Sequence, residues 1–262
     1  MKAKSGFGAI LLAVMVLVAG CGSEPSARQT ITVMDTVATL SATGRESEAA
    51  VSESMKRLKD LEAMASPNIE GSDVCKLSAA AGTGAWVPLH PEIYHMLEVS
   101  QQYSQLTGGA WDVTMGPLVN LWGFGPDKQP VKTPDPQQIA AAKARTGLQH
   151  LTVINHADRQ YLQKDIPDLF VDLSTVGEGY AADHLARLME QEGISRYLVS
   201  VGGALVSRGM NGDGQPWRVA IQKPTDRENA VQAIVDINGH GISTSGSYRN
   251  YYELDGKRIS HV

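Results

Sequence analysis

The chain has 262 residues, of which 42% are hydrophobic and 26 are glycine, enough to bury a core in one large domain or two small ones. The formal net charge is −5, and no long run of like charge occurs. These values argue against nucleic acid as a partner, because binding to phosphates requires a basic face.

Residues 1–20 have the features of a secretory signal peptide. Two lysines precede the apolar stretch "FGAILLAVMVLVAG", which is too short to cross a bilayer and ends in small residues. "VAG" followed by Cys21 is similar to a bacterial lipobox, in which the cysteine is lipidated and becomes the mature N-terminus; an ordinary signal peptide or a short anchor helix is the alternative. We expect residues 21–29 to form a lipidated flexible tether before a folded domain at 30–262. Cys75 is the only other cysteine, either a nucleophile or a buried structural thiol, so no internal disulfide is expected.

The first half of the mature chain is predicted to be mainly helical. Its β-branched start predicts a strand or hairpin, and the next segment has Val51, Met55, Leu58 and Leu61 on one helical face. Two later segments have proline at a helix start and glycine at its end. The predicted elements are a strand or hairpin at 29–43, a helix at 46–64, a loop at 66–84, a strand at 85–90, and helices at 91–109 and 135–147.

Strands dominate after residue 149, with one helix predicted at 175–192. The strand segments are "HLTVI" (150–154), "RQYLQK" (159–164), "LFVDL" (169–173), "RYLVSVGG" (196–203), "WRVAIQKP" (217–224), "AIVDI" (233–237) and "YYELDG" (251–256). Early helices followed by late strands predict an α+β fold with mainly antiparallel sheets and packed helices.

The stretch "VDLSTVGEGY" places Asp172, Ser174, Thr175 and Glu178 where a strand turns into a helix. Helix N-termini attract anions, and oxygen atoms at such a turn can bind a hard cation such as Mg²⁺. The alternative is capping, with Ser174 or Thr175 as N-cap and Glu178 completing a capping box. The two glycines flanking Glu178 favour the close approach of another group.

Two further segments combine glycine with aromatic or hydroxyl side chains. Residues 108–126, "GGAWDVTMGPLVNLWGFGP", are expected to form a loop, whose aromatic side chains can stack on a planar ring or cap a hydrophobic core. Residues 239–262 contain a hydroxyl cluster of the kind found in turns, then a tyrosine-rich turn and His261. The sequence contains no Walker A, G-x-G-x-x-G, H-E-x-x-H or G-x-S-x-G motif.

The stretches "VDLSTVGEGYAADHL", "GGAWDVTMGPLVNLWGFGP", "VSVGGAL" and "GISTSGSYRNYYELDGKRISHV", together with the lipobox, resemble those of the ApbE family of periplasmic FAD:protein FMN transferases. The resemblance implies an α+β fold that holds flavin between lobes. It also implies Mg²⁺-dependent transfer of FMN from FAD to a threonine hydroxyl of a target protein, with release of AMP. The implied targets are flavin-carrying subunits of NADH:quinone oxidoreductase or Rnf-type complexes. The implied location is the bacterial cell membrane, lipid-anchored and facing the periplasm.

The resemblance also assigns roles to single residues. Thr175 matches a metal ligand, through its main-chain carbonyl, and His261 matches a histidine near the reacting phosphate. The positions that match FAD contacts are Met34, Ala110, Trp111, Asp112, Asp172 and Glu178.

The sequence departs from the family pattern at two places. Asn68 is a further predicted cofactor-binding residue, although it stands where relatives often place an aromatic residue against the flavin. The chain ends at "SHV", where relatives continue with an "IDP-x-TG" stretch and further metal ligands, so we expect a member shortened at its C-terminus. Two alternatives to transfer therefore stay open: an FAD-binding lipoprotein without chemistry, and a Mg²⁺-dependent FAD pyrophosphatase.

Overall fold

The computed structural model describes residues 24–261 apart from 81, 83, 126–129, 131, 226–229, 238 and 249. The predicted signal peptide and Cys21 lie outside the described residues. Within the described ranges, no helix is both long and apolar enough to cross a membrane.

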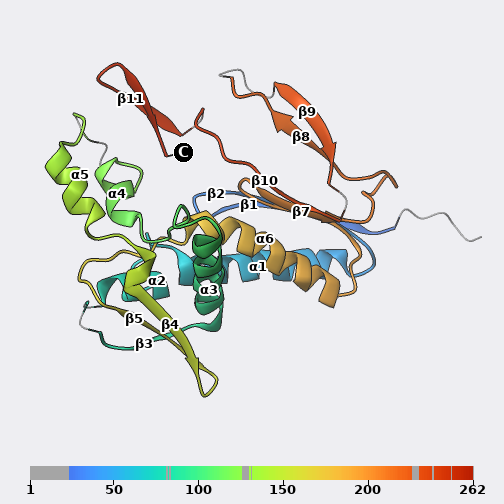
Figure 1. Cartoon of the computed structure of the whole chain (residues 1–262). Coiled ribbons are helices and arrows are strands. Elements are labelled where there is room, and N and C mark those ends of the chain that lie inside the picture. Colours follow the sequence, from blue (N-terminus) through green and yellow to red (C-terminus); the bar gives the residue numbers. More distant parts are fainter. Residues whose placement is uncertain are drawn as a thin grey trace, which may run out of the picture.

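A five-stranded antiparallel sheet forms the centre of the molecule (Figure 1). Its strands, in spatial order, are β1 (Ser26–Val33), β2 (Thr36–Thr43), β6 (Arg196–Val201), β7 (Ala204–Arg208) and β10 (Gly241–Ser243). The β1–β2 hairpin confirms the prediction for 29–43. The expected tether is shorter than predicted, because Ser26 already pairs with Thr43 and residues 26–29 belong to β1.

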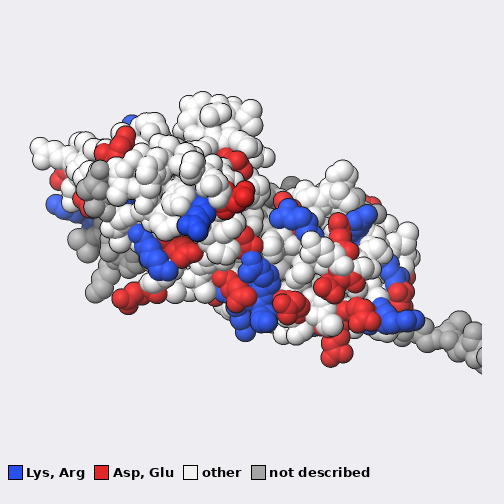
Figure 2. All heavy atoms as spheres, turned by 90° about the horizontal axis from the view of Figure 1, so that it is seen from below, with Lys and Arg blue, Asp and Glu red and all other residues white. Residues whose placement is uncertain are grey.

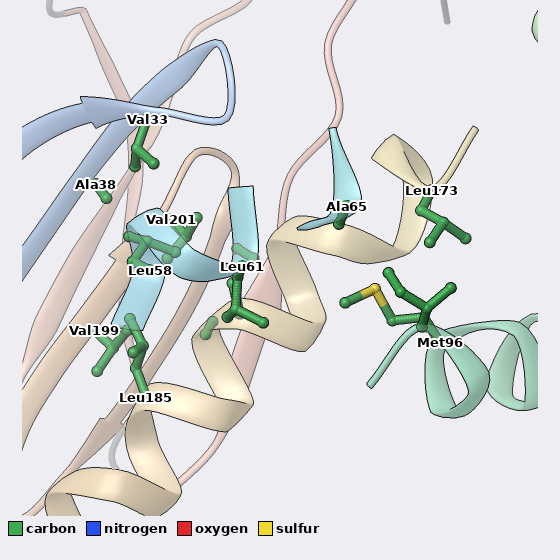
Figure 3. Packing of buried hydrophobic residues seen from close by; sticks show 14 of the residues in the cluster. Val33, Ala38, Leu58, Leu61, Ala65, Met96, Leu173, Leu185, Val199 and Val201 are labelled. Carbon is green, nitrogen blue, oxygen red and sulfur yellow. The ribbon is translucent and has the colours of Figure 1, made fainter. Parts of the chain in front are cut away.

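Two long helices, α1 (Ser47–Ala65) and α6 (Ser174–Gln191), pack against each other and against this sheet (Figure 1). Leu58, Leu61 and Leu185 from these helices lie beside Val199 and Val201 of β6 (Figure 3). The helix predicted at 46–64 is confirmed, and all four residues of its predicted apolar face are buried. The third long helix, α3 (Pro91–Leu106), contacts α6 and adds Met96 to the same core.

Smaller sheets and helices surround this core. A three-stranded sheet has the order β3 (Val87–Leu89), β5 (Arg159–Lys164) and β4 (Leu151–His156). The 3₁₀ turn η1 (Leu148–His150) leads directly into β4. Two hairpins are formed by β8 (Arg218–Gln222) with β9 (Val231–Asp236), and by β11 (Tyr251–Leu254) with β12 (Lys257–Ser260). The β11–β12 hairpin lies above α4 (Gly116–Leu121) and α5 (Pro136–Lys143) in Figure 1.

Two short helices were not predicted. Helix α2 (Asp73–Ala79) lies in the expected loop 66–84 and is capped by Ser72, whose hydroxyl accepts the Cys75 amide N–H at 3.0 Å. Helix α4 lies inside the glycine- and aromatic-rich segment that was expected to be a loop. Both helices have at most seven residues, too few for a hydrophobic period to be recognised. Cys75 itself is half-buried, and its Sγ lies 3.2 Å from the Pro67 carbonyl oxygen.

The strand predicted at 169–173 is wrong. This segment is extended, but its backbone makes isolated hydrogen bonds and no strand ladder. The Val171 amide donates to Ser78 Oγ at 3.1 Å, and the Asp172 amide donates to the Val113 carbonyl at 2.8 Å. The buried Lys164 donates to the carbonyls of Ser78 (2.8 Å) and Leu169 (3.2 Å). The alternation of buried side chains resembles a strand, although no partner strand is present among the described residues.

Acidic and basic side chains are interspersed on the face of the molecule shown in Figure 2. This face carries no broad basic patch.

Candidate functional site

A cavity of about 400 Å³ lies where five parts of the chain meet. Its walls are the β1–β2 turn, the end of α1 with the loop after it, the α4 segment, the elbow that leads into α6, and the C-terminal residues of the described chain. The cavity brings together seven of the predicted site residues: Met34, Asn68, Asp112, Asp172, Thr175, Glu178 and His261.

The elbow positions its carboxylates by hydrogen bonds to main-chain amides. Helix α6 begins at Ser174, its N-cap is Leu173, and no side chain caps it in the manner of a capping box. The capping interpretation of Ser174, Thr175 and Glu178 is therefore wrong. Asp172 Oδ1 instead accepts the Ser174 N–H at 2.9 Å, and the exposed Thr175 follows in the first turn, at the cavity wall.

Glu178 fits against the turn between β6 and β7. Its Oε2 accepts the Gly203 N–H at 3.0 Å. Gly202 has a φ of +55°, and a Cβ at this position would lie 1.9 Å from Glu178 Oε1. The "VSVGGAL" stretch therefore needs glycine at 202, both for its backbone conformation and for the space that the carboxylate occupies.

The β1–β2 turn forms the opposite wall. Met34 and Asp35 are its two central residues, with φ values of 55° and 56°, as in a type I′ turn. Asp35 Oδ2 accepts an N–H of Asn68 at 3.1 Å. Across the cavity, a Cβ at Gly177 would lie 3.1 Å from Met34 Cε, so Met34 reaches the first turn of α6.

The segment before α4 contributes Asp112 to the cavity, whereas Ala110 and Trp111 lie outside its lining. Asp112 Oδ1 accepts hydrogen bonds from the Thr114 amide (2.7 Å) and hydroxyl (2.6 Å). The Trp111 ring lies 5.7 Å from that of Tyr103, and its buried indole N–H has no partner among the described residues.

His261 lies at the cavity edge, exposed, with its ring 5.9 Å from that of Phe124. Its Nδ1 is 3.2 Å from the Asn250 carbonyl oxygen. Because a carbonyl can only accept, this contact requires a proton on Nδ1, and in the neutral ring Nε2 is then the basic nitrogen.

A second cavity of about 460 Å³ shares His261, Phe124 and Val119 with the first. Beside it, the Tyr252 hydroxyl donates to the Trp122 carbonyl at 2.6 Å, and burial raises the pKa of Tyr252. This phenol therefore stays neutral at physiological pH and ties the C-terminal hairpin to the α4 segment.

Sequence reasoning missed the lining residues Asp35, Glu62 and Phe170. Asn120 and Phe124 also line the cavity and lie within the segment 108–126 that the sequence analysis had identified. Asp35 stands in a two-residue turn between paired strands, a signal that could have been found from "MDT" between β-branched stretches. Glu62 has no sequence signal, because it is one acidic residue on the polar side of an amphipathic helix.

The cavity offers hard oxygen donors but no ready-made side-chain cage for a metal. Five carboxylates line it, and each accepts a hydrogen bond from a protein donor: Asp35, Glu62, Asp112, Asp172 and Glu178. In the described part of the chain, no three His, Cys, Asp or Glu side chains converge closely enough to hold a metal ion. Oxygen donors of this kind suit Mg²⁺, which commonly takes one or two carboxylates and completes its shell with water and phosphate oxygens.

Comparison with known proteins gives a consistent result. The model of the ApbE family matches residues 34–262. The FAD:protein FMN transferase of Klebsiella pneumoniae is 63% identical to this chain, and the match covers 98% of this chain and 76% of that protein. The FAD:protein FMN transferase of Salmonella typhimurium is 57% identical, and the match covers 97% of this chain and 75% of that protein. The chain thus spans about three quarters of the length of these relatives.

Solved structures agree with the sequence relatives. The flavin transferase ApbE from Vibrio cholerae superposes with a TM-score of 0.79 at 33% identity, over 91% of this chain and 75% of that one. The apo form of Pseudomonas stutzeri flavinyl transferase ApbE superposes with a TM-score of 0.79 at 34% identity, over 92% of this chain and 74% of that one. Both likenesses confirm the predicted α+β fold. By family model, sequence identity and structure, the chain belongs to the ApbE family.

Proposed function

We propose that this chain transfers the FMN part of FAD to a threonine hydroxyl of a target protein and releases AMP. The observation that carries the proposal is the cavity, which joins the acidic elbow, the β1–β2 turn and His261 in a chain of the ApbE family. The relatives with the same family features are named FAD:protein FMN transferases.

The chemistry is a substitution at the FMN phosphorus. The threonine oxygen forms a bond to this phosphorus, the bond from phosphorus to the bridging oxygen breaks, and AMP leaves with that oxygen. The threonine proton passes to Nε2 of His261, the basic nitrogen in the tautomer that Asn250 selects. His261 is exposed, as a base that meets an incoming protein must be.

The charge of the cavity supports a requirement for Mg²⁺. Five carboxylates and the FAD pyrophosphate repel each other, and the lining residues that the structure describes include no lysine or arginine to offset them. Thr175, through its carbonyl, and the nearby carboxylates would hold the cation. When bound, Mg²⁺ supplies neutralisation of the pyrophosphate and of the leaving group.

We further propose that the targets are flavin-carrying subunits of NADH:quinone oxidoreductase or Rnf-type complexes, and that lipid on Cys21 anchors the chain at the periplasmic side of the membrane. Both follow from the family resemblance and the lipobox in the sequence.

The test incubates the full chain with FAD, MgCl₂ and an acceptor domain, and follows the acceptor by mass spectrometry and the nucleotides by chromatography. Transfer yields flavinylated acceptor and AMP in equal amounts. Intact FAD that co-purifies with the protein indicates a binding protein, and free FMN with AMP indicates a pyrophosphatase. An acceptor whose target threonine is replaced by alanine, and a reaction with EDTA, are the matched controls.

A further inference from the structure

Glu62 lies on the last turn of α1, outside every motif that the sequence suggested, yet it lines the cavity and is half-buried. Its Oε1 accepts the main-chain N–H of Met34 at 2.5 Å. This bond joins residues 28 positions apart and is made to the first central residue of the β1–β2 turn.

The turn that donates this bond has a backbone conformation that is unfavourable for its sequence. Type I′ turns prefer Asn-Gly or Gly-Gly. Here both left-handed backbone positions are occupied by residues other than glycine, Met34 and Asp35. Such conformations persist when the surroundings hold them. Here two bonds do so: the Met34 amide donates to the Glu62 carboxylate, and the Asn68 side chain donates to the Asp35 carboxylate.

The position of Met34 matters because its side chain crosses to α6. Its terminal methyl lies against Gly177, between Thr175 and Glu178 in the sequence of the elbow. A turn that relaxed from the left-handed conformation would withdraw Met34 from Gly177 and open this side of the cavity. Glu62 thus acts on the cavity through Met34.

We infer that Glu62 is a positioning residue for cofactor binding: its carboxylate fixes the β1–β2 turn so that Met34 closes the cavity over the first turn of α6. The inference rests on the proposed function in so far as the ligand is FAD. The hold on the turn itself does not depend on that function.

The test compares Glu62→Gln with Glu62→Met in the full chain. Both replacements are good helix formers of similar length, so α1 is preserved, but only glutamine keeps an oxygen that can accept the Met34 N–H. Glu62→Met should raise the Kd for FAD about tenfold. It should also speed hydrogen exchange of the Met34 amide by at least about tenfold, because losing a hydrogen bond to a charged group has an effect of about this size. Glu62→Gln should stay within about threefold of the parent on both measures.

The matched control is Glu53→Met, on the same helix, where the glutamate is exposed and its side chain contacts only Lys56 in the described ion pairs. It should change neither measure.

Equal Met34 exchange rates in the parent, the Gln variant and the Met variant would overturn the hold on the turn. Faster exchange with unchanged FAD affinity would overturn the link from the turn to binding. A parent that binds no FAD, titrated calorimetrically with and without Mg²⁺, overturns the proposed function and the link to binding, while Met34 exchange still decides the hold on the turn.

Discussion

At the scale of single residues, the carboxylates of the cavity are oriented mainly by main-chain amides, not by cationic side chains. Met34, Thr114, Ser174 and Gly203 each donate an amide N–H to one of them. An amide orients a carboxylate but does not cancel its charge. The cavity therefore keeps an acidic character, which a cation bound with the pyrophosphate would balance.

Asp172→Ala should weaken FAD binding about 10- to 100-fold, because a hydrogen bond to a charged group contributes roughly 1.5–3 kcal/mol. Titration calorimetry with Mg²⁺ present measures the change. Asp172→Asn is the control for helix geometry, since its amide oxygen can still accept the Ser174 N–H. Parent-like affinity in a folded Asp172→Ala protein would contradict a role for this carboxylate in binding.

His261→Ala should lower the rate of FMN transfer about 10²–10⁴-fold, the usual contribution of a general base, and leave the Kd for FAD nearly unchanged. Single-turnover transfer and calorimetry separate the two effects. His156→Ala, which removes an exposed histidine at the end of β4, is the matched control. A transfer rate within a few-fold of the parent would exclude His261 as the base.

At the scale of elements, the elbow depends on an extended segment that no sheet supports. Residues 169–173 are held by Lys164, Ser78 and the Val113 carbonyl, and they lead directly into α6. Leu169, Val171 and Leu173 are apolar at alternate positions, as in a strand, and all three are buried. Side-chain-to-backbone bonds between distant residues leave no periodic signal in a sequence.

Lys164→Met should lower the free energy of unfolding by about 1–3 kcal/mol at neutral pH, because two buried carbonyls lose their donor. Burial lowers the pKa of Lys164. The unfolded chain therefore binds more protons between the lowered pKa and about 10.4, and the parent gains stability as the pH rises through that window. The difference in the free energy of unfolding between the parent and Lys164→Met, measured by urea unfolding, should therefore widen as the pH rises. The control Lys143→Met, which replaces an exposed lysine, should show neither the loss of stability nor the pH dependence.

Helices α1, α3 and α6 meet at a polar cluster separate from the cavity lining. Arg57 of α1 pairs with Glu92 of α3, and its Nε donates to His184 Nε2 of α6 at 3.2 Å. His184 Nδ1 faces Glu92 at 3.5 Å. Burial lowers the pKa of His184, and the neighbouring Arg57 and Arg187 act in the same direction against the opposing effect of Glu92.

Acidification should therefore loosen this cluster. Because the pKa is lower in the folded chain than the usual value of about 6.5, the unfolded chain takes up the proton first, and stability falls as the pH drops below that value. The free energy of unfolding should decrease more steeply between pH 7 and 5 in the parent than in His184→Gln. The control His156→Gln should follow the parent, and an identical slope in His184→Gln would refute the role of His184.

At the scale of the whole molecule, the sequence predicted the α+β class, the long helices and most strands, because these elements carry strong periodic patterns. It did not predict α2, α4 or the extended segment at 169–173, which are defined by caps and tertiary bonds. For the site, long motifs identified the elbow and Asp112. The aromatic segment 108–126 also contained Phe124, which lines the cavity. Glu62 could not be predicted, since only the tertiary fold brings it to the cavity.

Under the proposed lipid anchor, Cys21→Ser should leave the protein unlipidated, because a hydroxyl would not replace the thiol proposed to accept the lipid. Fractionation of cells should then move the variant from the membrane to the soluble fraction, while Cys75→Ser stays with the membrane. A variant that still fractionates with membranes would show that the N-terminal apolar segment is itself the anchor.

The walls of the cavity come from residues as far apart as Met34 and His261, nearly the whole described chain. A ligand that fills such a cavity can bind only when the distant parts are assembled, so its binding free energy adds to the free energy of unfolding. FAD at one hundred times its Kd would contribute about 2.7 kcal/mol in this way. Cofactor supply would then set how long the folded chain persists, as well as how fast it works.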